Sequence, residues 1–270
     1  MTAVATMTPT AWLRIFFRGG LTSYRALFNW IRPAILIPTF VVLPIFQILL
    51  FVYIGRSAGI ESDEFFVIGN ALQFAATPCL FAMADTISGE RQQHTLSLIL
   101  VSPAPRIPLF LGRSLPVIAN GFLASAFALL AAGLLLGIDV PSGAVLPLVL
   151  TIAVTSLSCT GLGLVNAALG LRVRETAVLS NVIFGVLLVF CGVNVPLARL
   201  PHWMAVVSDY LPLTHGIAAA RQLAGGAHLG TVAGLIGWEL LVGTCYVAVG
   251  FALLQVLERE SRRTASLDRF

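Results

Sequence analysis

Long apolar runs alternate with short polar passages along almost the whole chain. A helix needs roughly 20 apolar residues to cross the hydrocarbon core of a bilayer, and six runs meet this requirement. The third and fourth runs are long enough to tilt or to extend beyond the lipid. The pattern therefore predicts six transmembrane helices, at residues 34–54, 65–84, 108–137, 144–170, 176–195 and 232–257.

The N-terminal residues 1–33 have a helical pattern of a different kind. Arginines recur in one sector of a helical wheel drawn over this segment, and aromatic and leucine side chains occupy the opposite sector. This pattern predicts an amphipathic helix in the membrane surface, with Gly19 and Gly20 favouring an interruption. A loose basic tail is the alternative, although tails rarely place tryptophans in this phase. The residues expected at the interface are Trp12, Arg14, Arg18, Arg25 and Trp30.

Residues 195–226 are moderately apolar but broken by prolines and by a pair of glycines. Two short helices, at 201–209 and 213–223, fit this passage better than another span. Because they are too short to cross, we expect them to enter the outer leaflet and return, packed against protein or a water-filled cavity.

The composition requires a membrane environment. Only 10% of the 270 residues are charged, 58% are hydrophobic and the mean hydropathy is +0.94, whereas soluble domains carry about 25% charged residues. We expect an all-α membrane protein whose single permease domain covers residues 34–257, between the N-terminal segment and a cytoplasmic tail at 258–270.

The arginines predict the orientation. With six spans, 13 arginines fall on the side of the termini and three, Arg56, Arg199 and Arg221, fall on the other side. Positive residues collect on the cytoplasmic side of a membrane. We therefore expect a multi-pass protein of the cell membrane with both termini in the cytoplasm.

The sixteen basic residues are all arginines. A phosphate-binding P-loop needs a lysine, so we expect no ATP site in this chain. The cysteines Cys79, Cys159, Cys191 and Cys245 lie singly in apolar runs, which favours buried side chains over a metal or redox site. We expect no metal ligand, no resident cofactor and no nucleic-acid partner.

The most polar interior passage is ISGERQQHTLSLILVSPAPRIPLFLGR, residues 87–113. Ser88 is a suitable N-cap for a short cytoplasmic helix at 89–100, which the prolines Pro103 and Pro105 would end. Glu90 and His94 share a face of this helix, but no hydrolase motif surrounds them. Catalysis, a solvated face and a docking surface are the three interpretations, and docking is favoured.

This passage resembles the coupling segment of type-2 ATP-binding-cassette exporter permeases. In that family a glutamate and an arginine precede a small-residue–threonine–leucine step, and a serine–proline pair closes the helix. His94 departs from the pattern, since glycine is common there. The YLPLTHGIAAARQLAGG passage, at the end of residues 195–226, is similar to the family's outer re-entrant segment. The matching positions are Glu90, Arg91, Thr95, Leu96, Ser102 and Pro103, and the residues expected to couple to the ATPase also include Gly89 and His94.

The resemblance implies a permease subunit without catalytic residues. Two such chains, identical or related, would meet in lipid and sit on separate ATPase subunits, which bind ATP and Mg²⁺ and drive export of an amphipathic drug, lipid or glycan. An outer gate would involve Pro212, Thr214 and Arg221.

Three side chains are candidates for the substrate pathway: Phe40, Phe46 and Glu239. Glu239 lies within the sixth predicted span, where a carboxylate costs ~2.5–3.5 kcal/mol on insertion scales. It could contact substrate, pair with Arg221 or make a structural hydrogen bond. Phenylalanines on spanning helices more often pack or face lipid, and that interpretation is favoured for Phe40 and Phe46.

Two other classes of protein compete with this interpretation. A self-contained secondary transporter or channel would favour several intramembrane charges, but five of the six predicted spans contain no acidic residue. A membrane-embedded lipid-modifying enzyme would need clustered acidic or histidine side chains, and the four histidines are divided between the two sides.

Overall fold

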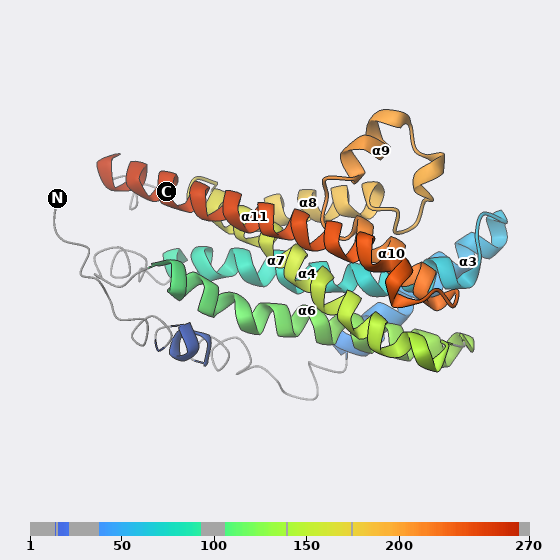
Figure 1. Ribbon diagram of the computed structural model, residues 1–270. Coiled ribbons are helices and arrows are strands. Elements are labelled where there is room, and N and C mark those ends of the chain that lie inside the picture. The colour runs from blue at the N-terminus through green and yellow to red at the C-terminus, as the bar shows by residue number, and fades with distance from the viewer. Residues whose placement is uncertain are drawn as a thin grey trace.

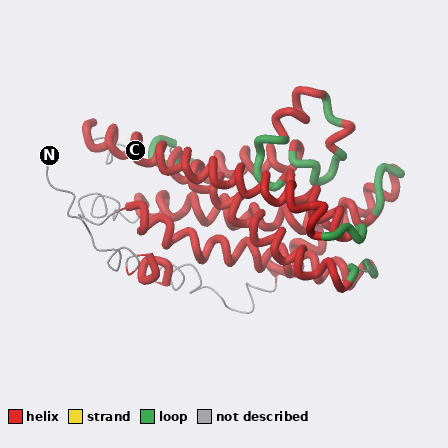
Figure 2. Tube along the Cα trace, in the orientation of Figure 1, coloured by secondary structure: helices red, strands yellow, loops and turns green. Residues whose placement is uncertain are grey.

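The computed structural model describes most of the chain as helix. It describes residues 14, 16–21, 38–92, 106–138, 140–173 and 175–264. Within these residues there is no strand, and the described connections between helices are loops and turns (Figure 2). The prediction of an all-α protein is confirmed for the described part.

Five helical segments are long and apolar enough to cross a membrane. They lie close to the first, second, third, fourth and sixth predicted spans. The helices that contain them are α3 (Leu43–Ala58, preceded by the π-helix η1 at Pro38–Val42), α4 (Asp63–Gln92), α6 (Arg106–Leu136), α7 (Val145–Leu169, preceded by the 3-10 turn η2 at Ser142–Ala144) and α11 (Leu229–Thr264).

The fifth predicted span, 176–195, is wrong in its length. Its helix α8 covers only Thr176–Phe190, and irregular backbone follows, with Gly192 at a positive φ of 71°. Fifteen residues reach about 22 Å, which is less than the roughly 30 Å of a hydrocarbon core. The described chain therefore has five candidate spans and one shorter apolar helix.

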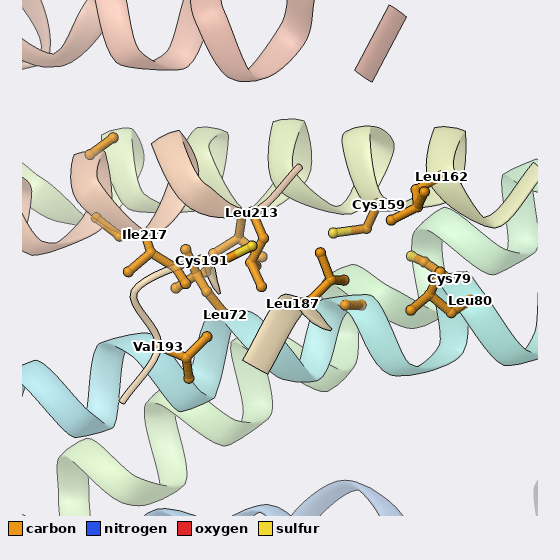
Figure 3. Close-up of a cluster of buried hydrophobic side chains, with 14 of the residues drawn as sticks. Leu72, Cys79, Leu80, Cys159, Leu162, Leu187, Cys191, Val193, Leu213 and Ile217 are labelled. Atoms are coloured by element: carbon orange, nitrogen blue, oxygen red, sulfur yellow. The ribbon is translucent and has the colours of Figure 1, made fainter. Parts of the chain in front are cut away.

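The helices form an elongated bundle in which α7 lies between α4 and α11 (Figure 1). Spans α4 and α7 are largely buried, whereas α3, α6 and α11 keep most of their surface exposed. Small residues allow the close approach of α4 and α7. Figure 3 shows Cys79 and Leu80 of α4 beside Cys159 and Leu162 of α7 in the main hydrophobic cluster.

The direction of the helices gives the bundle two chemically different ends. The C-terminal ends of α4 and α11 and the N-terminal end of α6 lie together, at the left in Figure 1. The α3–α4 turn and helix α10 (Thr214–Ala224) lie at the opposite end. This grouping agrees with the predicted separation of arginines, although the side of the membrane that each end faces stays a prediction.

Only a part of the predicted interfacial helix is described. Residues 16–21 form helix without an interruption at Gly19 or Gly20, contrary to the expected break. A Cβ on Gly20 would lie 2.9 Å from the carbonyl oxygen of Gly112, so this helix contacts the start of α6 closely. Arg14 and Arg18 are exposed, and Trp12, Arg25 and Trp30 lie outside the described residues.

Helix α11 extends beyond the predicted sixth span. It continues from Leu257 to Thr264, so the first half of the predicted tail at 258–270 is a helical extension of α11. Helix formers such as Leu, Glu and Arg dominate these residues, and no glycine or proline stops the helix there.

Candidate functional site

The predicted coupling segment begins as the end of a long span. Helix α4 continues through Ser88 to Gln92, so Gly89, Glu90 and Arg91 belong to α4. The expected new helix start at Ser88 is wrong. A serine and a glycine in sequence each cost only up to about 1 kcal/mol in a helix interior, and no proline occurs between Pro78 and Gln92 to end it. The remaining predicted coupling residues, His94, Thr95, Leu96, Ser102 and Pro103, lie outside the described residues.

This end of α4 is attached to the beginning of α6. Arg113 of α6 donates a hydrogen bond from its guanidinium to the carbonyl oxygen of Thr86, at 3.2 Å. Thr86 in turn donates its hydroxyl to the carbonyl of Met83, at 2.6 Å. Gly112, one residue before Arg113, is the position against which residue 20 packs. A force applied near Glu90 would therefore act on α4, α6 and the N-terminal helix together, because these three helices are in contact here.

The outer segment contains two short helices close to their predicted positions. They are α9 (His202–Ser208) and α10 (Thr214–Ala224), with a 3-10 turn, η3 (Leu197–Arg199), before them. Pro212 lies two residues before the start of α10, and its carbonyl lies 3.4 Å from the Sγ of Cys191. Thr214 is the first residue of α10 and is buried. Whether these helices enter the bilayer stays a prediction.

Glu239 caps the N-terminus of α10 from the neighbouring helix α11. Its two carboxylate oxygens accept hydrogen bonds from the backbone N–H of Leu213, at 2.7 Å, and of Gly216, at 3.0 Å. These are the N-cap and third helical positions, two donors that a helix leaves without internal partners. The positive end of the α10 dipole adds a favourable interaction with the carboxylate. Only 1% of Glu239 is exposed.

Arg221 holds the other end of α10. Its Nη2 donates to the carbonyl oxygens of Phe65, at 2.9 Å, and Val193, at 3.0 Å. Its guanidinium carbon lies 3.5 Å from the centre of the Phe65 ring, which is a cation–π contact. The pairing of Arg221 with Glu239 that we considered from the sequence is not formed, because the two side chains bind at opposite ends of α10.

The two other arginines predicted at this end also reach the α3–α4 turn. Arg56 makes an ion pair and hydrogen bonds with Asp63, with Nε to Oδ1 at 2.9 Å. Arg199 donates to the carbonyl of Ile60 at 3.3 Å and lies 3.7 Å from Glu61. All three outer arginines thus bind residues between 60 and 65, so the start of α4 anchors the outer segment.

A cluster of side-chain amides, which the sequence analysis did not identify, joins three elements near this anchor. Gln47 of α3 donates to Asn70 of α4 at 3.2 Å, and Asn70 donates to Asn194, after α8, at 2.7 Å. The terminal amide nitrogens of Gln73 and Asn194 are buried and have no hydrogen-bond partner among the described residues. The sequence does contain a signal for this cluster, because polar residues recur every three or four positions along α4, at Asn70, Gln73 and Thr77.

The remaining predicted pathway residues lie on α3 and the turn before it. Phe46 is 70% exposed, and half-buried Phe40 packs against a small cluster formed by α3, α4 and α6. Glu239 has a different setting, since it bonds to the start of α10 where α7 packs against Gly216 of α10 and Gly243 of α11. The four cysteines are free, and Cys245 alone among them is exposed. Within the described ranges, no group of acidic, cysteine or histidine side chains could hold a metal ion.

Comparison with known families gives one extended match. A family model described as ABC-2 type transporter matches residues 21–224, a range that contains α3 to α10 and the whole predicted coupling segment. The comparison with curated proteins gave no match.

Proposed function

The chain belongs to the ABC-2 type transporter family, and from this premise we propose that it forms one half of the membrane pathway of an exporter driven by a separate ATPase. The observation that carries the proposal is the family match over residues 21–224. The multi-pass helical bundle agrees with it. Membership of this permease family implies partnership with an ATP-binding-cassette ATPase subunit.

We propose that the ATPase docks at the end of α4 that carries Gly89, Glu90 and Arg91. The stretch of α4 that is apolar enough to cross a membrane ends at Thr86, and these residues continue the helix beyond it. The carboxylate of Glu90 can accept hydrogen bonds from a partner protein, and the guanidinium of the adjacent Arg91 can donate several. The Arg113 hydrogen bond to Thr86 supports transmission of the movement to α6.

A second permease chain would complete the pathway. Helices α3 and α11 keep mostly exposed apolar surfaces, which lipid or a second chain can cover. The unpartnered amide nitrogens of Gln73 and Asn194 would offer hydrogen bonds to an amphipathic substrate that has acceptor oxygens. Glu239, Phe40 and Phe46 stay candidate pathway residues. We propose outward transport past α9 and α10 with ATP and Mg²⁺ bound on the partner.

The experiment that tests this function is purification of the tagged chain from its native membranes in a mild detergent. The proposal predicts that a chain with a phosphate-binding P-loop co-purifies and that the eluate hydrolyses ATP. A chain from which the last residues of α4 (89–92) are deleted is the control, and it should lose the ATPase while remaining in the membrane. Recovery of a stable chain alone, with no ATP hydrolysis, would contradict the proposal and would favour a secondary transporter or a membrane-embedded enzyme.

A further inference from the structure

A charged side chain attaches each end of helix α10 to another span. At the N-terminal end the side chain belongs to the other span, and at the C-terminal end it belongs to α10. Glu239 of α11 binds the backbone at its N-terminus. Arg221, in its last turn, binds the backbone at Phe65 in α4 and at Val193 after α8. Negative charge at the N-terminus and positive charge at the C-terminus both match the helix dipole. An eleven-residue helix therefore connects α11 to α4.

The attachment at the N-terminus of α10 involves a residue with an unusual backbone conformation. Leu213, the N-cap residue, has φ 86° and ψ −32° and is the only described residue other than glycine with positive φ. Such a conformation costs on the order of 1–3 kcal/mol and persists when surrounding contacts fix it. Here the Glu239 carboxylate holds the Leu213 N–H, the Leu213 carbonyl accepts the first helical bond from Ile217 at 2.9 Å, and the leucine side chain is fully buried.

The second attachment is equally specific in its geometry. Gly69 of α4 leaves the space that the Arg221 guanidinium uses, since a Cβ there would lie 2.6 Å from Nη2 and would overlap the Val193 carbonyl. The guanidinium covers the face of Phe65. Position 69 therefore accepts only glycine while Arg221 is bound, which ties the arginine to one place on α4.

Between the two attachments, α10 covers a buried cysteine. Figure 3 shows Leu213 and Ile217 gathered with Cys191, Leu72 and Val193. Cys191 is 1% exposed, and its Sγ lies 3.4 Å from the Pro212 carbonyl. The cysteine is thus a native reporter of whether α10 is in place.

We propose that Glu239 and Arg221 are positioning residues that hold α10 as a two-ended bridge from α11 to α4, and that the bridge closes the outer end of the chain until these spans move apart. The closing role rests on the proposed function, since it assumes that ATP hydrolysis by the partner moves the spans. The attachment itself depends only on the contacts within this chain. In the closed arrangement Glu239 acts through backbone geometry, because both of its carboxylate oxygens accept hydrogen bonds from N–H groups at the start of α10.

The bridge is tested by the reaction of Cys191 with a membrane-impermeant maleimide. The full chain, with whatever partners co-purify, is placed in lipid nanodiscs without ATP, and labelled cysteines are located by peptide mass spectrometry. We expect Glu239→Gln and Arg221→Gln each to raise the Cys191 labelling rate about tenfold, as for loss of one hydrogen bond to a charged group. Gln222→Ala, at the exposed neighbour of Arg221 on α10, should label as the wild type does.

Cys79 separates a released bridge from an unfolded chain. It is also buried, but it lies on α4 between α6 and α7, against Gly121 and Ser156, so it should stay unlabelled in both variants. Equal increases at Cys191 and Cys79, no increase at Cys191, or an increase in only one of the two variants would each overturn the bridge. If Glu239→Gln or Arg221→Gln does not accumulate, Glu239→Asp, which keeps the charge but shortens the reach, and Gly69→Ala, which displaces the guanidinium, replace them with the same expectations.

A second arm separates the bridge from the proposed function. With ATP and vanadate, wild-type Cys191 should become more reactive if a partner ATPase moves the spans. A bridge that responds to Glu239→Gln and Arg221→Gln but not to ATP would contradict the closing role and the ATP-driven function. It would leave the two attachments established.

Discussion

Gly163 of α7 lies directly against the backbone carbonyl of Cys79 on α4, with no room for a side chain between the two helices. In a bilayer, where apolar side chains gain nothing by leaving lipid, such close approach of small residues is a main source of helix association. The two most buried spans of the chain are joined at this point, and everything that moves α4 must carry α7 with it.

Replacement of Gly163 by alanine should therefore destabilise the bundle. The added methyl group would overlap a carbonyl that cannot rotate away, and overpacking of this kind costs about 1–3 kcal/mol. Thermal unfolding in detergent measures the effect. Gly237→Ala on α11, where a Cβ meets open space, is the matched control and should leave the midpoint unchanged or raise it. A midpoint for Gly163→Ala equal to that of Gly237→Ala would contradict the packing argument.

Glu90→Ala and Arg91→Ala should leave folding intact and uncouple transport from ATP hydrolysis. Both residues lie in the last turn of α4, after the stretch that could cross a membrane, so we expect little change in thermal unfolding. ATP-dependent efflux of a fluorescent amphipathic dye should fall at least about tenfold, the effect of losing a charge-assisted contact. Glu61→Ala, which removes a carboxylate at the opposite end, is the control. Normal efflux by both alanine variants would defeat the docking role.

Glu239→Gln should alter efflux more than association with the ATPase. The amide keeps one acceptor oxygen, but its NH₂ group would face the second backbone N–H at the start of α10, so one of the two hydrogen bonds is lost. The site lies at the opposite end of the bundle from Glu90, and co-purification of the ATPase should be unaffected. Unchanged efflux in this variant would assign Glu239 a purely structural role.

The exposed ion pair of Arg56 and Asp63 should contribute far less to stability than the half-buried Arg221. Arg56 and Asp63 are partly exposed, and exposed pairs contribute at most about 1 kcal/mol, less as salt rises. Arg56→Gln should therefore shift the thermal midpoint only slightly at low salt and not at all at high salt. Arg221→Gln, which leaves two carbonyls of this anchor without a donor, should shift it more and independently of salt. Equal, salt-sensitive shifts would show that the half-buried arginine is also a surface residue in solution.

The apolar pattern predicted the long helices well because a bilayer makes length and hydropathy decisive. The bounds of α7, 145–169 against an expected 144–170, depend on little else. The pattern failed for α8, where the apolar run continues to Val195 but the backbone breaks at Cys191 and Gly192. Hydropathy does not distinguish a helix from an apolar loop buried under α10.

The site was less predictable because it depends on backbone groups. An acidic residue in a span identified Glu239 as significant, but its partners are the N–H groups of Leu213 and Gly216, which have no signature in the sequence. The same holds for Arg221, whose partners are carbonyls on two other elements. The continuous α4 through Ser88 was missed because a good capping residue was given more weight than the helical context around it.

Docking of an ATPase on this chain is tested most directly by a photo-crosslinking amino acid introduced at Gln92, the last residue of α4. After irradiation of native membranes, the captured protein is identified by mass spectrometry, with the same amino acid at Ile60 in the α3–α4 turn as the control. If the ATPase docks at this end of α4, position 92 captures an ATP-binding-cassette ATPase subunit and position 60 does not. Capture of the ATPase from position 60, or of no ATPase from position 92, would contradict it.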